Sequence, residues 1–451
     1  MKYPFRTDKR FRYVTAALVI SGLLMSSPAL AEEIPMPIKP GDRLTADRCV
    51  SIALERHPQL LAAQGTVKAS ESKIGQAVAG YLPQINLNAS YSKIKNPPGS
   101  VVTSGTDAAT IGVNRKPFDQ YSGAITASQL LYDFGKTPNQ IWIQKYGAEA
   151  ARGDLGGTKG TLILSVRQAY YGLLAAQRSR EVAKEVVTQY EQHLQQAKGF
   201  FEVGTKPKFD VIKAQAELST AKLNLIKAEN ALKIAKVTLN NAMGVPDAPD
   251  YTIEDSLDVV KKEIPFSEAI SRAYQSRPEL LASQARIKAA DEQVSYAYKG
   301  FFPSISASGS YNRVGREFYP PEGWSAGITA TWGLFNGFET VHKVREAKAN
   351  LETARANHEL LKQNVLLEVQ QAYLQLLQAK ESIPTAELGV QQATENLEIA
   401  NGRYKAGVGN PIEVTDAEIT YMNAKNAHTQ ALYDYQVAVA SLDRAIGGMQ
   451  Q

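Results

Sequence analysis

The sequence predicts a mainly helical fold built from two copies of one long helical hairpin, with four short β-strands in each chain. Apolar residues recur at steps of three and four from Leu162 to Ala242, interrupted at Arg180 and by a break near Gly204. The same pattern returns 203 residues later, from Val365 to Ala424. Four other segments of about ten residues alternate between apolar and small polar residues, which is the period of a strand.

Residues 1–31 have the three parts of a secretory signal peptide. A segment with five cations precedes an apolar core over residues 14–25, and Ala29 and Ala31 mark a cleavage site. The mature chain is therefore expected to be exported. Removing five cations and Asp8 lowers the net charge from +5 to about +1. Lysine and arginine are scattered among glutamates, so the sequence gives no basis for a nucleic-acid partner.

The first repeat is expected over residues 32–244. After a proline-rich opening, a helical pattern over residues 45–80 contains Pro58. Because proline removes an amide donor and clashes with the preceding turn, the pattern predicts a short helix, a break and a longer helix. Pro83 then ends the helical period. Two strands follow, over about residues 84–93 and 121–131.

The second repeat is expected over residues 266–451. Its prolines Pro278 and Pro303 follow those of the first repeat by 220 residues. The loop between its two strands is shorter, so the offset between equivalent residues falls to 203 after that loop, in the long helical hairpin. Its strands are predicted over about residues 304–313 and 324–334. Residues 245–265, with three prolines and six acidic residues, are expected to form the linker between the repeats, with a short strand over residues 251–253.

The longest predicted helix runs from Asn139 to Gly199, which is about 90 Å at 1.5 Å per residue. A glycine cluster over residues 153–160 is expected to weaken its first third, and Pro384 predicts a kink in the second copy only. Cys49 is the single cysteine, and it is expected to be a buried apolar residue.

The four strand segments fit transmembrane strands, because each has one apolar face and one polar but uncharged face. After the signal peptide, no apolar run reaches the 18 residues that suggest a membrane-spanning helix. Four strands cannot close, and open edges in lipid leave backbone groups unpaired, so a spanning barrel must be shared between chains. Five aromatic residues near the strand ends predict an aromatic girdle, with ordinary sheet packing as the alternative: Tyr91, Tyr121, Tyr311, Trp324 and Trp332.

Taken together, these features resemble the outer-membrane efflux protein family, whose members are TolC-like. The resemblance covers nearly all of residues 43–447. It rests on the duplication and on three kinds of motif that occur twice in the same order. These are the helix-to-strand segments Tyr81-Leu82-Pro83 and Phe301-Phe302-Pro303, the strand-to-helix turns at residues 131–135 and 334–337, and the helix-to-helix turns at residues 201–205 and 404–408.

The resemblance implies a homotrimer. Its four strands per chain would form a 12-strand barrel in outer-membrane lipid, and its hairpins a trimeric α-barrel roughly 100 Å long in the periplasm. In this family the helical turns form a periplasmic tip, which docks a periplasmic adaptor, the membrane fusion protein. The adaptor joins the duct to an inner-membrane transporter of the RND or ABC type.

The resemblance also assigns site residues. Glycine suits a helix C-terminus for backbone reasons alone, which is the alternative explanation at the tip turns. The expected docking residues are Val203, Gly204, Thr205, Ala406, Gly407 and Val408. Glu413 and Asp416 match the family's acidic constriction, and Asp210 matches Glu413 in the first copy, although acids in a first helical turn also complement the helix dipole. Tyr404 matches a residue that latches the closed tip, but Gly409 stands where some relatives have an arginine.

The expected function is that of an outer-membrane export duct in a tripartite efflux or type I secretion system. The duct conducts passively, with a long periplasmic extension and no catalytic residue, cofactor or metal site. The five histidines show no spacing typical of metal ligands. One alternative is a periplasmic coiled-coil adaptor or tether without a membrane barrel, and another is an exported enzyme. The exported substrate is left open.

Overall fold

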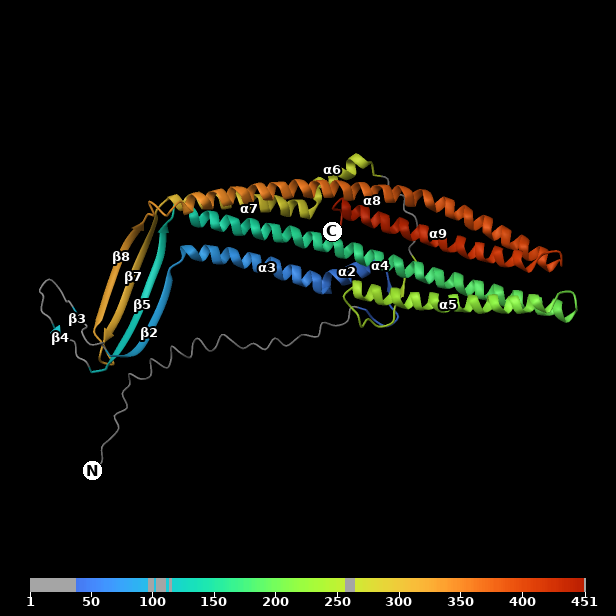
Figure 1. Cartoon of the computed structure of the whole chain (residues 1–451), viewed down its shortest axis with the longest axis horizontal. Coiled ribbons are helices and arrows are strands. Elements are labelled where there is room, and N and C mark those ends of the chain that lie inside the picture. The colour runs from blue at the N-terminus through green and yellow to red at the C-terminus, as the bar shows by residue number, and fades with distance from the viewer. Residues whose placement is uncertain (1–37, 96–100, 103–110, 113–115, 256–263, 450–451) are drawn as a thin grey trace, which may run out of the picture.

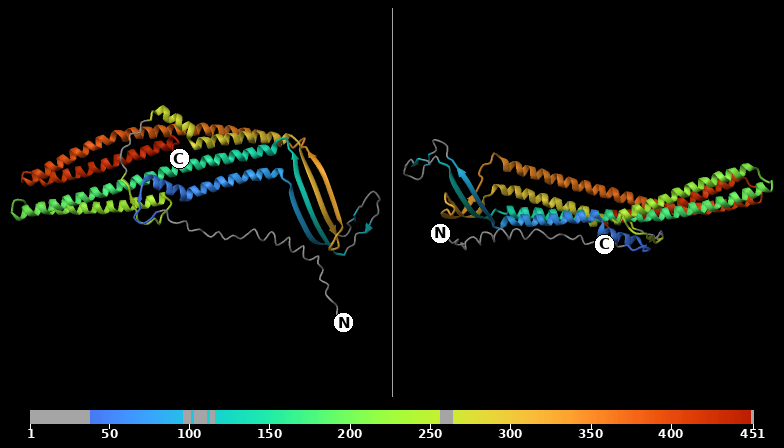
Figure 2. Two further views of the ribbon diagram at one scale, coloured as in Figure 1. Left: turned by 180° about the vertical axis from the view of Figure 1, so that it is seen from behind. Right: turned by 90° about the horizontal axis from the view of Figure 1, so that it is seen from below.

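The computed structural model describes residues 38–95, 101–102, 111–112, 116–255 and 264–449. The expected signal peptide, residues 1–31, and part of the expected linker lie outside these residues. The described chain is long and narrow, with a sheet at one end and two helical turns at the other (Figure 1). Figure 2 shows this arrangement from two further directions.

The two repeats contain the same series of helices. Helices of 11, 21, 67 and 35 residues follow one another in each repeat. In the first repeat these are α2 (Ala46–Arg56), α3 (Pro58–Val78), α4 (Lys136–Glu202) and α5 (Lys208–Ala242). In the second they are α6 (Phe266–Ser276), α7 (Pro278–Tyr298), α8 (Glu339–Lys405) and α9 (Pro411–Ala445). The short 3-10 helices η2 (Ala79–Tyr81) and η3 (Lys299–Phe301) follow α3 and α7.

The helix break expected at Pro58 is confirmed, and the second repeat has the same break. Pro58 and Pro278 are each the first residue of a helix, where a missing amide costs nothing. His57 caps α3, because its Nδ1 accepts a hydrogen bond from the Gln59 amide at 3.3 Å. Each repeat therefore has two shorter helices that end beside one uninterrupted long helix.

The expected weakening of the first long helix is wrong, because α4 is continuous through its glycines. These glycines allow α7 to approach. A Cβ at Gly153 would lie 2.7 Å from the Pro278 carbonyl oxygen and 2.8 Å from the Ala282 Cβ. Helix α8 contains Pro384 within its length, and the kink expected there stays a prediction. At 1.5 Å per residue, α4 and α8 are each about 100 Å long.

The sheet is antiparallel, with strand order β2-β5-β7-β8. Its strands are β2 (Gln84–Ile94), β5 (Phe118–Tyr132), β7 (Ser304–Gly315) and β8 (Glu322–Thr331), and β3 (Val101–Val102) pairs with β4 (Ile111–Gly112) separately. The register places Leu87 opposite Ile125, Ile125 opposite Tyr311, and Tyr311 opposite Trp324. The apolar residues of all four strands therefore share one face. Serine, threonine and asparagine predominate on the other face.

Midway along the molecule, the linker pairs with the start of the first repeat. β1 (Arg43–Leu44) and β6 (Thr252–Ile253) form a parallel pair, in agreement with the strand expected in the linker. The hydroxyl of Tyr170 on α4 donates a hydrogen bond to the Glu254 carbonyl at 2.7 Å. Cys49 is fully buried in the apolar core beneath this pair, as expected. We call this region, with α2, α6 and the ends of α5 and α9, the belt.

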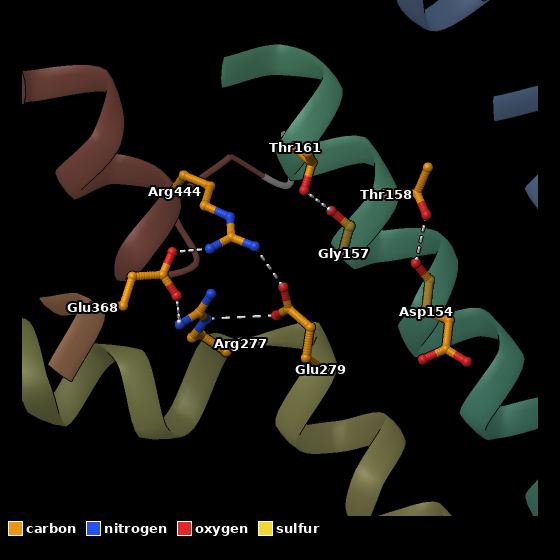
Figure 3. Close-up of polar contacts among 8 residues, drawn as sticks. All are labelled: Asp154, Gly157, Thr158, Thr161, Arg277, Glu279, Glu368 and Arg444. Carbon is orange, nitrogen blue, oxygen red and sulfur yellow. Dashed lines mark hydrogen bonds and ion pairs between the residues drawn. The ribbon is translucent and has the colours of Figure 1, made fainter. Parts of the chain in front are cut away.

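Four charged residues form a closed network in the belt on the side of the second repeat (Figure 3). Arg277, which is 3% exposed, donates to Glu368 at 2.7 Å and lies 3.5 Å from Glu279. Arg444 pairs with the same two carboxylates. Each carboxylate thus bridges both guanidinium groups, and the network joins α7, α8 and α9 at the helix break.

Candidate functional site

Both tip turns are Schellman motifs, in which a left-handed glycine closes the helix. Gly204 has φ +75°, and the amides of Gly204 and Thr205 bond back to the carbonyls of Phe201 and Phe200 at 3.0 and 2.9 Å. Gly407 has φ +77°, and the amides of Gly407 and Val408 donate to the carbonyls of Tyr404 and Arg403 at 3.0 and 3.1 Å. Helix termination therefore accounts for both glycines by itself.

The residues around these glycines leave an apolar surface open at the tip. Val203 and Val408 are each 71% exposed, and Phe209 is 66% exposed. The two turns lie together, because the Lys206 ammonium reaches the Gly409 carbonyl oxygen at 3.5 Å. The six expected docking residues, Val203, Gly204, Thr205, Ala406, Gly407 and Val408, are thus gathered on one end of the molecule.

The expected constriction acids differ in their surroundings. Glu413 and Asp416 are both exposed on the first turns of α9. Glu413 accepts a hydrogen bond from Arg403 Nε at 3.2 Å, so part of its charge is neutralised locally. Asp210, its counterpart in the first repeat, is buried at 6% exposure. The chain therefore separates Asp210 from the two exposed acids.

Gly409 has no room for a side chain. A Cβ there would lie 2.7 Å from the Tyr404 nitrogen and 2.9 Å from the Arg403 carbonyl carbon. The Gly409 amide also donates to the Arg403 carbonyl at 2.9 Å. A guanidinium is still present at the tip, but it comes from Arg403 on the last turn of α8.

Tyr404 is fully buried between the two hairpins. Its ring packs on His193 and Phe200 of α4, with centroids 4.9 and 5.6 Å away. Burial, with a smaller effect from Asp210, raises the pKa of Tyr404. Burial also lowers the pKa of His193, and Lys213 acts in the same direction. The structure thus brings Tyr404 together with Asp210 and His193.

Glu418 is a buried acid that the sequence reading did not single out. It is 1% exposed on α9, and burial raises its pKa to about 8 although Tyr190 of α4 donates a hydrogen bond to it. Glu217 of α5 adds to the rise by repulsion. The two acids flank apolar seam positions, Leu218 and Ala417, and that placement was the available sequence signal.

The expected girdle residues lie at the two ends of the sheet. Tyr91, Tyr121, Tyr311 and Trp324 occupy paired positions near the ends that carry the loops. Tyr91 donates to Asp119 at 2.8 Å, and Tyr311 donates to Glu322 at 2.6 Å. Trp332 lies just beyond β8, and its ring nitrogen donates to the Phe301 carbonyl at 3.0 Å. Trp324 and Trp332 are 80% and 60% exposed.

Within residues 38–449, apart from the gaps named above, no three histidine, cysteine, aspartate or glutamate side chains gather as metal ligands would. In the same part of the chain, no helix has the length and apolar character of a membrane span.

Comparison with known proteins agrees with this architecture. The family model described as outer membrane efflux protein matches residues 49–245 and 269–448. The outer membrane protein TolC of Vibrio cholerae is 25% identical over 415 residues, which cover 88% of this chain and 90% of that protein. The alkaline protease secretion protein AprF of Pseudomonas aeruginosa is 26% identical over 404 residues, or 87% and 82% of the two chains.

Solved structures have the same fold. The Campylobacter jejuni CmeC outer membrane channel matches with a TM-score of 0.77 at 19% identity, and the match covers 89% of this chain and 85% of that one. Since the family model covers most of the sequence, the chain belongs to the outer membrane efflux protein family.

Proposed function

We propose that this chain forms a homotrimeric export duct. Its strands join into a 12-strand barrel in outer-membrane lipid, and its helices form a continuous α-barrel in the periplasm. The duct conducts passively and works with a periplasmic adaptor and an inner-membrane transporter of the RND or ABC type. Family membership and the exposed apolar face of the sheet support this function over that of a periplasmic tether.

The observation that carries the proposal is a helix–helix contact whose equivalent in the other repeat is not made within one chain. Helix α9 packs against α4, with Ala440 and Ile163 in one apolar cluster. The counterparts of these residues are Val237 on α5 and Leu366 on α8, yet α5 and α8 are not neighbours within the described chain. Joining α5 to the α8 of another copy would repeat the contact and allow a ring to close.

Exposed apolar residues support this contact. They follow the spacing of a helical stripe on both helices. On α5 these residues are Phe209, Ile212, Leu223, Ile226, Ile234 and Val237, and on α8 they are Leu360, Leu367, Leu374, Leu377, Leu388 and Ile399.

The sheet also requires contact with another copy of the chain. Strands β2 and β8 are its two edges. An edge strand exposes unpaired amide and carbonyl groups, each costing several kcal/mol in lipid. Pairing β8 of one copy with β2 of the next removes both edges, so the sheet and the helices call for the same head-to-tail ring.

At the opposite end, we assign adaptor docking to the apolar tip surface around Val203 and Val408. We assign the ion constriction to Glu413 and Asp416, which three copies would present as six carboxylates. A ring of like charges attracts cations. The duct opens when the hairpins move apart at the tip turns.

Single-channel recording in a planar bilayer tests conduction. The mature protein is expected to form cation-preferring channels, and replacing Glu413 and Asp416 together by alanine is expected to abolish the preference. Unchanged conductance and selectivity would remove these acids from the constriction. Absence of any channel, with the protein extractable from cells by salt alone, would overturn the duct in favour of the tether.

Oligomer mass in detergent tests the ring. Leu374→Glu and Ile226→Glu each place a charge in the proposed contact, so each is expected to yield mainly monomers in light scattering. Gln375→Glu adds a charge at an exposed polar position of α8 that lies about 100° around the helix from Leu374, and it is the matched control. Intact oligomers in both interface variants would contradict the ring.

A further inference from the structure

A cavity lies where α9 meets the first hairpin near the tip. Its volume is about 400 Å³, and α4, α5 and α9 line it. Its walls are largely apolar, formed by Ala183, Val186, Ala216, Ala221, Ile419 and Met422. Two carboxylates, Glu217 and Glu418, also line it. The volume is at the small end of the range for ligand sites.

The two carboxylates in this cavity are incompletely satisfied. Oε1 of Glu217 accepts a hydrogen bond from the Thr415 hydroxyl at 2.8 Å, and Lys213 Nζ lies 3.7 Å away. Tyr190 donates to Glu418. Among the described residues, however, neither Glu217 Oε2 nor Glu418 Oε2 has a hydrogen-bonding partner. A buried oxygen without a partner costs free energy, which a donor entering the cavity would recover.

The charges of the lining residues identify the kind of donor. Lys213 is the single cation among the lining residues, and it faces two acids. No other titratable group besides Tyr190 lines the cavity. A metal ion is disfavoured, since the described residues hold no cluster of three His, Cys, Asp or Glu ligands.

We propose that this cavity binds a small amphipathic ammonium ion, with the ammonium between Glu217 and Glu418 and an apolar stem against Ala183, Val186 and Met422. A primary ammonium supplies three donors. The short stem fills space that water wets poorly. Binding requires only the packing of one chain, so it does not depend on whether the duct conducts.

Calorimetric titration of the full mature protein with phenethylamine, in a nonionic detergent, tests the proposal. Saturable binding with one site per chain is expected. 2-Phenylethanol has the same stem without the charge, and it is expected to bind at least tenfold more weakly. Binding is expected to strengthen from pH 7 to pH 9, as Glu418 loses its proton while the amine keeps its charge. Equal binding of amine and alcohol would overturn the ammonium site.

Two variants separate the site from general packing. Glu418→Gln keeps the size of the side chain and is expected to weaken phenethylamine binding at least tenfold. Ala216→Leu fills the cavity from an exposed position of α5, leaves both acids in place and is expected to abolish binding. Glu229→Gln, at an exposed acid of the same helix, is the control and is expected to bind as the unaltered protein does. Unchanged binding in both cavity variants would place any bound amine elsewhere.

Discussion

The two repeats share one backbone at the helix break but fill it with different chemistry. In the second repeat, Arg277, Glu279, Glu368 and Arg444 form the closed ionic network. None of their counterparts in the first repeat is an arginine, lysine, aspartate or glutamate: His57, Gln59, Ser165 and Asn241. These four residues line a cavity of about 760 Å³ instead.

The backbone contact at the break is the same in both repeats. Gly244 and Gly447 both have positive φ, and a Cβ on either would lie 3.0 Å from the backbone of the facing helix break. Both positions require glycine because two backbone segments touch there. The surrounding polar residues can differ between the repeats, since the backbone contact does not depend on them. Replacing a residue by the one at the equivalent position of the other repeat therefore tests which sequence differences affect the free energy of unfolding.

Glu418→Gln is expected to give the largest effect of these exchanges, and the effect is on how the free energy of unfolding depends on pH. The glutamine is the residue that the first repeat has at the equivalent position, Gln215. The pKa of Glu418 is about 8 in the folded chain against an ordinary 4.5, so the folded state holds a proton that the unfolded chain releases. The stability from this proton is complete below about pH 4.5 and lost as the pH rises to about 8. The loss is on the order of 3 kcal/mol. Urea unfolding of the solubilised protein at several pH values measures it.

The variant is expected to flatten this pH dependence. The reverse exchange, Gln215→Glu, places an acid at an exposed site on α5 and is expected to add no slope. An unchanged slope in Glu418→Gln would mean that another group takes up the proton.

Arg277→His, which installs the counterpart of His57, ranks second. It leaves Glu279 and Glu368 with Arg444 alone. Removing one member of a buried ion pair costs about 3 to 5 kcal/mol, and partial exposure of these carboxylates reduces that to about 2 kcal/mol. Urea unfolding again provides the measurement. His57→Ala removes only a helix cap, which costs about 1 kcal/mol. Equal losses in the two variants would show that the ionic network adds no stability beyond that of a helix cap.

Gly153→Ala installs the counterpart residue Ala356 and is expected to cost about 1.5 kcal/mol. The added Cβ collides with α7, and overpacking outweighs alanine's better helix propensity. Gly147→Ala is the control, because nothing lies within 4 Å of its added Cβ. That variant is expected to gain stability, and a gain at both positions would show that α7 yields to the methyl group.

Tyr404→Phe, which installs the counterpart of Phe201, is expected to change stability by less than about 0.5 kcal/mol. The Tyr404 hydroxyl is buried, and it has no hydrogen-bonding partner among the described residues. Its removal therefore deletes no hydrogen bond. Thermal unfolding checks this, and a loss above about 1 kcal/mol would reveal a hydroxyl contact made in the oligomer.

The sequence predicted the features that depend on local chemistry. The breaks at Pro58 and Pro278 follow from the proline ring, and the shared apolar face of the strands follows from a period of two. The turn glycines Gly204 and Gly407 follow from helix termination. These features do not require knowledge of what lies nearby in space.

The features that the sequence misjudged or missed depend on distant partners. Gly153 belongs to a glycine cluster that was expected to weaken the helix, and its close contact with α7 cannot be seen in the sequence. Glu418 lies one position from the apolar seam, and only the approach of Tyr190 and Glu217 from the other hairpin buries it. Arg403 pairs with Glu413 at the tip because of where α8 ends, which spacing alone does not reveal.

The unbroken helices α4 and α8 have a mechanical consequence. Among the described residues of each repeat, only one helix crosses the belt without interruption, while α2 and α3, or α6 and α7, end beside it. A wall bends most easily at the level where its stiff elements are fewest. Sideways movement of the tip is therefore expected to be absorbed at the belt, which would spare the sheet at the far end the strain.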